Sequence, residues 1–119
     1  LTKFITPQKT KVHYSIETNA TLLTNDVIEE LYKNHIGIGI SIDGDRKCHD
    51  LQRTFVSGKG SYDTVKKNLL QAQRYYKNKI GTITTITKQT AVHIEKIIEH
   101  LVLDLHISNI KLNFVHAST

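Results

Sequence analysis

Five polar side chains fall at the ends of two expected strands and in the segment that follows the second: Glu17, Asn19, Ser41, Asp43 and Arg53. A guanidinium can bind a carboxylate through two parallel hydrogen bonds, while hydroxyl and amide groups orient other polar atoms of a ligand. The set therefore predicts a binding site for a small zwitterionic molecule. The competing interpretation is that each side chain caps a neighbouring loop or lies at the surface.

Residues 36–43 read IGIGISID, so isoleucine alternates with Gly, Gly, Ser and Asp. Successive side chains of a strand point to opposite faces, which gives one apolar face and one nearly bare face. Glycine weakens a strand and is expected where a ligand or a backbone approaches closely. We predict that the isoleucines lie beneath helices and that Ser41 and Asp43 face a cavity.

The elements that position these residues alternate between strand and helix, and residues 44–60 form a long polar loop. A Thr24-Asn25-Asp26 start with Glu29 predicts a capping box on the first helix. Ser61 is expected to cap the second helix. The pattern predicts four strands, near 12–19, 36–43, 80–87 and 107–116, and three helices, near 25–33, 61–79 and 94–105.

Strict alternation predicts right-handed crossovers and a parallel sheet, hence an α/β fold in a single domain over residues 1–119. An open doubly wound sheet would need apolar residues on both strand faces. The first two strands each have one polar or empty face, which favours a barrel or half-barrel with a ligand inside. Its chemistry would lie at the carboxyl ends of the strands.

The composition is that of a globular protein with a net charge of +5 and 39% hydrophobic residues. No apolar run approaches the ~20 residues of a membrane helix and no signal peptide opens the chain, so we expect a cytoplasmic protein without a membrane partner. The basic residues of 66–79 surround a helix and few aromatics accompany them, which argues against nucleic-acid binding. The lone Cys48 excludes an internal disulfide or cysteine cluster. The absence of methionine predicts a piece of a larger chain.

Other motifs are weaker. Gly58-Lys59-Gly60-Ser61 resembles a phosphate-binding turn but lacks the full spacing. His93 and His100 lie too far apart for an i, i+4 zinc pair, so no metal site is predicted. No Ser/His/Asp set has a hydrolase context, and only Lys88 is a Schiff-base candidate for a conventional barrel lyase or aldolase.

Four short motifs resemble one family. Residues 18–23 (TNATLL) are similar to the TNGTLL segment of radical S-adenosylmethionine (SAM) enzymes of the anaerobic sulfatase-maturating type and of their SPASM-type peptide-modifying relatives. Residues 39–44 (GISIDG), the HDxxR pattern of 49–53 and residues 58–63 (GKGSYD) match that family in the same order and spacing.

The resemblance implies the later part of a partial (β/α)6 barrel. It implies that Ser41 and Arg53 hold the methionine carboxylate of SAM, that Asn19 faces the cofactor, and that Glu17 and Asp43 shape the cavity. The apolar strand at 112–114 would lie against the adenine or ribose. The parent enzyme would use a 4Fe-4S cluster and SAM to form a 5′-deoxyadenosyl radical that modifies a peptide or protein substrate.

The chain also departs from the family. It lacks the CxxxCxxC cluster loop, the GGEP strand and the auxiliary-cluster cysteines, and Ala20 replaces a glycine. We therefore expect no cofactor bound to this fragment, no activity of the fragment alone, no assignable catalytic residue, and dimerisation through exposed sheet edges. The alternative is a non-enzymatic basic α/β module that binds an anionic ligand or an acidic protein.

Overall fold

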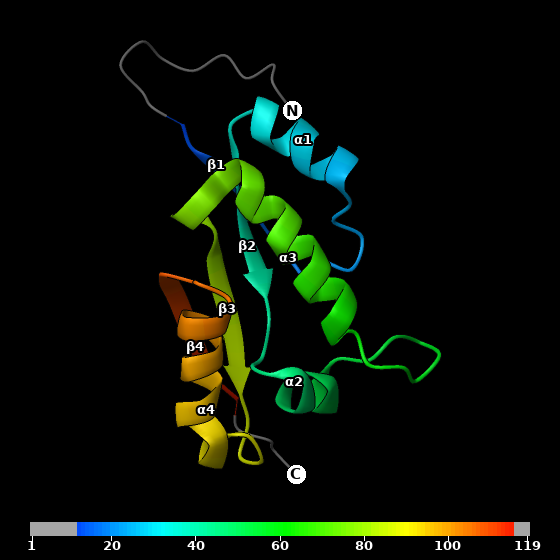
Figure 1. Ribbon diagram of the computed structural model, residues 1–119, viewed down its shortest axis with the longest axis vertical. Helices are drawn as coiled ribbons and strands as arrows, with labels where there is room; N and C mark the ends of the chain where they lie inside the picture. Colours follow the sequence, from blue (N-terminus) through cyan, green and yellow to red (C-terminus); the bar gives the residue numbers. More distant parts are fainter. Residues whose placement is uncertain (1–11, 116–119) are drawn as a thin grey trace.

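The computed structural model describes residues 12–115 and contains one parallel sheet (Figure 1). The strands lie side by side in sequence order: β1 (Tyr14–Thr18), β2 (Ile36–Ser41), β3 (Gly81–Ile86) and β4 (Asn109–Phe114). All three pairings are parallel, as the alternation of strands and helices predicted. Within residues 12–115, β1 and β4 are therefore the two edges of an unclosed sheet.

Four α-helices connect and cover the strands: α1 (Asn25–Lys33), α2 (Arg46–Gln52), α3 (Tyr62–Tyr76) and α4 (Ile94–Glu99). Short 3-10 turns follow α3 (Lys77–Lys79) and precede α4 (Ala91–His93). A π-helical turn, His100–Asp104, extends α4. Figure 1 shows α1 and α3 side by side over the sheet, with α2 beyond the end of β2.

The expectation of three helices was wrong, because α2 lies within the predicted loop 44–60. This helix has seven residues, too few to show a clear apolar stripe. Its start has a local signal nevertheless: Asp45 is the N-cap, and its carboxylate accepts a hydrogen bond from the Cys48 backbone N–H at 3.0 Å.

The isoleucines of 36–42 are all buried beneath the helices, as predicted. Ile38, Ile40 and Ile42 belong to one core cluster with helix residues, which include Ile28, Val65, Leu69, Ile97 and Leu101. Thr82 and Thr84 of β3 share this covered face, because Thr82 pairs with Ile40. One side of the sheet is therefore buried in the core, whereas the alternate residues of β2 and β3 on its other side are only partly buried.

Two predicted helix caps do not form. Thr24 is the N-cap of α1, but its side chain makes no capping hydrogen bond, and the expected box is absent. Ser61 holds the N-cap position of α3 without capping it. The Asp50 carboxylate takes over this role and accepts the Tyr62 N–H at 2.9 Å. A residue distant from the helix start supplies the acceptor, which a local pattern does not reveal.

The last strand also differs from the expectation. Leu112 and Phe114 pair with Thr84 and Ile86 and so share their side of the sheet, opposite the glycine face, although both side chains remain partly exposed. Asn109, Lys111 and Asn113 lie on the glycine face, because they pair with Gly81, Ile83 and Thr85. The final predicted strand residue, His116, lies outside the described residues. Among the helices of 12–115, none combines the length and apolar character needed to cross a bilayer.

Candidate functional site

The glycine-bearing face of the sheet lines an open hollow of about 320 Å³. The strand register pairs Ser15 with Gly37, Glu17 with Gly39, and Gly39 with Gly81. The expected orientation of β2 is confirmed: its isoleucines are covered by helices, and Ser41 shares the alternate face with the glycines. Polar side chains from the outer strands rim this face: Ser15, Glu17, Asn109 and Lys111.

Neither backbone strain nor crowding requires a glycine at position 39. Within residues 12–115, only Gly44 and Gly58 among the glycines have positive φ. A Cβ at Gly39 would meet Glu17 Cγ, the Ile16 carbonyl oxygen and Ile83 Cδ1 at 3.7 Å, which is ordinary contact. The consequence of glycine here is therefore open space above the face, the situation expected where another group approaches.

A buried ion pair lies just beyond the carboxyl end of β2. Arg53 Nε is 2.6 Å from Asp43 Oδ2, and Arg53 Nη2 is 3.5 Å from Oδ1. The Asp43 side chain is 1% exposed, whereas the Arg53 side chain is 30% exposed. Two further donors reach the carboxylate, Gln52 Nε2 at 2.8 Å and the Thr85 backbone N–H at 2.9 Å. The carboxylate is thus satisfied, and its charge holds the guanidinium.

The second hollow, of about 260 Å³, opens beside this pair. It lies at the carboxyl ends of β2 and β3, where parallel sheets bind ligands. Its lining consists of Asp43, Gln52, Arg53, Thr85 and Thr87. Arg53 Nη1 makes no hydrogen bond to any residue of 12–115. This donor and the partial exposure of the side chain suit a hydrogen bond to the carboxylate of a small ligand.

The other predicted site residues are less tightly grouped. Ser41 is partly exposed on the glycine face, and its hydroxyl makes no hydrogen bond within the described part of the chain. Glu17 is exposed on the same face, opposite Gly39. The Asn19 side chain folds back on its own turn, where Oδ1 accepts the Thr21 N–H at 3.1 Å and the Thr21 hydroxyl at 2.9 Å.

Several residues of the site were not anticipated. Gln52 and Thr85 bind the Asp43 carboxylate, and His49 and Ser61 lie behind it. Thr85 could have been found from alternation along β3, which puts it on the same face as Gly81 and Ile83. His49 opens the HDxxR motif, but the motif does not indicate its hydrogen bonds. Gln52 has no sequence signal, because it belongs to the short helix α2 within the predicted loop.

An iron–sulfur cluster does not fit this chain. Within residues 12–115 no three His, Cys, Asp or Glu side chains come together as a metal-binding group. The one cysteine of the sequence, Cys48, is 3% exposed. Burial raises the pKa of its thiol to about 11, so the thiolate that a metal needs is disfavoured.

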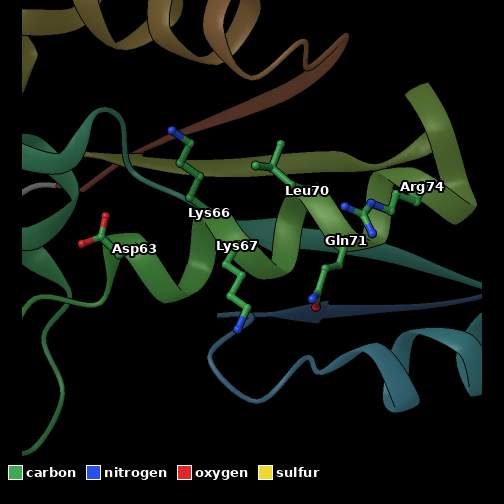
Figure 2. A pocket seen from close by; sticks show the side chains of 6 residues that line it. All are labelled: Asp63, Lys66, Lys67, Leu70, Gln71 and Arg74. Atoms are coloured by element: carbon green, nitrogen blue, oxygen red, sulfur yellow. The ribbon is translucent and has the colours of Figure 1, made fainter.

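The basic surface of α3 is a separate feature (Figure 2). A groove of about 410 Å³ follows this helix, and every residue that lines it belongs to α3. Lys66, Lys67 and Arg74 provide its positive charge beside the exposed Leu70. It is a furrow along one helix rather than a cleft between elements.

Comparison with known proteins identifies relatives for this arrangement. No family model matches the chain. It is 36% identical over 86 residues to a cysteine-type anaerobic sulfatase-maturating enzyme of Clostridium novyi, which covers 72% of this chain and 23% of that protein. A second enzyme of that name, from Clostridium perfringens, is 27% identical over 90 residues.

Solved structures share the fold. Native anSMEcpe with bound AdoMet superposes with a TM-score of 0.79 at 24% identity, over 92% of this chain and 29% of that one. The same protein with AdoMet and the Cp18Cys peptide gives a TM-score of 0.81 at 23% identity, over 89% and 29%. The chain thus has the fold of one part of that larger protein, a partial barrel, and spans about a quarter of the length of its curated relatives.

Proposed function

We propose that this chain, which is related in sequence and fold to radical SAM enzymes of the anaerobic sulfatase-maturating type, forms the SAM-orienting part of such an enzyme. In the complete protein it would supply the later strands of the barrel and one side of the cofactor cavity. The observation that carries the proposal is the Asp43–Arg53 pair, which holds a partly exposed guanidinium at the carboxyl ends of the strands.

Arg53 is the residue we assign to the carboxylate of the methionine moiety. Its Nε is committed to Asp43, which fixes the plane of the guanidinium and leaves the Nη1 side for a ligand. Ser41 lies on the same side of the sheet with its hydroxyl free of partners among residues 12–115, and we assign it a second hydrogen bond to the same moiety. Asp43 then acts through Arg53 rather than by touching the ligand.

Glu17, Asn19 and the bare glycine face would shape the rest of the cavity. Glycines 37 and 39 leave room above the sheet, and Glu17 presents a carboxylate at its rim. The Asn19 amide nitrogen stays available, because its hydrogen bonds to Thr21 use only the oxygen. When bound and reductively cleaved, SAM supplies a 5′-deoxyadenosyl radical able to abstract a hydrogen atom from a substrate.

The substrate we propose is a peptide or protein. Support comes from the related anSMEcpe, which was solved with peptides as well as AdoMet. The 4Fe-4S cluster and any auxiliary SPASM-type clusters would be held by other parts of the complete protein, since this chain offers no ligand set within 12–115. We accordingly propose that the isolated chain is inactive and binds neither SAM nor the 4Fe-4S cluster tightly. We also propose that the parent enzyme is cytoplasmic.

The test is the affinity of the complete protein for SAM, measured by isothermal titration calorimetry. Arg53→Ala should lower the affinity about 10- to 100-fold, the range for loss of a charged hydrogen-bonding partner. Arg46→Ala is the matched control, because Arg46 carries the same charge but pairs with the exposed Asp63. Equal affinities for the wild type and both variants would contradict the assignment of Arg53.

The sheet edges support a proposal about assembly. β1 and β4 each have one unpaired edge among the described strands, and Ile16 and Leu112 on them are 36% and 42% exposed. Neighbouring strands of the complete protein would cover these edges, and in the isolated chain a second copy would do so. Light scattering over a range of concentrations tests this, since a monomer at every concentration would refute dimerisation.

A further inference from the structure

His49 is buried behind the Asp43–Arg53 pair, and both of its ring nitrogens are hydrogen-bonded. The Asp43 backbone N–H donates to Nδ1 over 3.1 Å. The other nitrogen, Nε2, lies 3.0 Å from the Ser61 hydroxyl oxygen. That hydroxyl donates in turn to the Arg53 carbonyl oxygen, also over 3.0 Å. Four residues are thereby linked in one continuous chain.

The chemistry of the donors fixes the protonation of the ring. A backbone N–H can only donate, so Nδ1 must be unprotonated and the proton of neutral His49 must be on Nε2. Nε2–H then donates to Ser61, whose own hydrogen is committed to Arg53. No arrangement with a protonated ring preserves the bond to Asp43. The link therefore exists only while His49 is neutral.

This series of hydrogen bonds begins and ends at the two residues that form the ion pair. It joins the backbone of Asp43 to the backbone of Arg53, while their side chains join each other on the opposite side. Arg53 is held further by its N–H, which donates to the His49 carbonyl at 2.9 Å, and by its carbonyl, which also accepts from the Ser61 N–H at 3.3 Å. Arg53 is thus held at its backbone by the bonds of its N–H and its carbonyl, and at its guanidinium by the pair with Asp43.

We propose that neutral His49 is a positioning residue which, through Ser61 and the Asp43 backbone, sets the orientation in which Arg53 meets the carboxylate of its ligand. The inference rests on the proposed function for the identity of that ligand, whereas the positioning of Arg53 can be measured without it. Protonation of His49 would release the Asp43 N–H and weaken ligand binding.

The surroundings of His49 keep it neutral. Burial is the largest effect and lowers the pKa of the ring below its usual 6.5, with Arg53 acting in the same direction. The carboxylates of Asp43 and Asp50 act against it. The ring also contacts the Ser61 hydroxyl and lies 5.9 Å from the Tyr62 ring between centroids. The link is therefore complete above pH 6.5 and is lost as the pH falls through the lowered pKa.

The first experiment compares SAM affinity of the complete protein between pH 5 and pH 8 by calorimetry. His49→Gln keeps a donor near Ser61 but cannot titrate, and Ser61→Ala is a milder change that removes the link to Arg53. Both should lower the affinity about tenfold at pH 8, as expected for the loss of one or two hydrogen bonds. The wild type should lose affinity on acidification through the His49 transition, and His49→Gln should lack that transition.

His100→Gln is the matched control. His100 is also largely buried and contacts α3, through the Tyr62 hydroxyl, but its other nitrogen bonds Asp104 and it has no link to Arg53. The His100→Gln variant should leave the SAM affinity at pH 8 unchanged. The proposal is overturned if His49→Gln and Ser61→Ala bind SAM as the wild type does, or if His49→Gln retains the acid transition.

A second readout separates this proposal from the function on which it rests. The exchange rate of the Arg53 Nε proton, followed by NMR in selectively labelled protein, reports its bond to Asp43 without any ligand. Faster exchange in Ser61→Ala supports the positioning role even if SAM does not bind. Unchanged exchange overturns it, even if Arg53→Ala shows that Arg53 itself binds SAM.

Discussion

Asp43 and Arg53 form an ion pair with only one side open to solvent: the aspartate side chain is 1% exposed and the arginine side chain 30%. The pair joins the end of β2 to the residue just after α2. Because Asp43 also accepts from Gln52 and Thr85, it ties together α2, β2 and β3. The Asp43 carboxylate therefore orients Arg53, the candidate ligand-binding residue, and links α2, β2 and β3 to one another.

We expect Asp43→Asn to destabilise the fold by about 3 kcal/mol, the typical penalty when one partner of a buried pair is removed. The new amide would present hydrogens toward Gln52 and Arg53, which are themselves donors. Urea unfolding measures the change. Asp63→Asn is the control, because its pair with Arg46 is exposed and surface pairs contribute roughly 0–1 kcal/mol. Equal effects for the two variants would argue against the anchoring role of Asp43.

Gly44 is required by both its backbone and its neighbours. Its φ is +135°, and a Cβ there would lie 2.8 Å from Ile97 Cγ1 and 3.2 Å from Cys48 Cβ. Gly44→Ala should therefore destabilise by about 2–4 kcal/mol through strain and overpacking. Gly58→Ala serves as the comparison, since Gly58 has a φ of +88° but open space around it. Its thermal midpoint should fall less than that of Gly44→Ala.

Gly39 provides a test of whether the open face is reserved for a ligand. Gly39→Ala should leave the protein as stable or add about 0.5–1 kcal/mol, because the new Cβ makes ordinary contacts and glycine disfavours strands. Gly39→Leu should keep the fold but fill the hollow and lower SAM affinity in the complete protein at least tenfold. Undiminished affinity of Gly39→Leu would show that the cofactor does not occupy this face.

Lys77 ends α3 in a conformation suited to glycine, with φ of 57° and ψ of −124°. Lys77→Gly should stabilise the protein by about 1 kcal/mol, because this region is costly for residues with a Cβ. Lys77→Ala retains the Cβ and should bring no comparable gain. Urea midpoints of the three proteins decide the matter, and a destabilised Lys77→Gly would contradict the strained geometry.

The sequence by itself determined the fold class and the face of β2 that lies beneath the helices. Alternation of strand and helix patterns required parallel pairing, and the IGIGISID repeat fixed which side of β2 lies beneath helices, because side-chain direction in a strand has a period of two residues. It also singled out Asp43 and Arg53 as site candidates, although it gave no reason to pair them with each other.

Tertiary structure decided how the site is held together. The hydrogen bonds that connect Asp43 to Thr85 and His49 to Ser61 span 42 and 12 positions of the chain, and the Asp50 bond to Tyr62 spans another 12. Such contacts depend on the positions of α2 and β3 relative to each other and to β2, which the local periodicity of the sequence does not encode. The short helix α2 was missed for the same reason: its stability comes from buried Cys48 and His49 rather than from an apolar stripe.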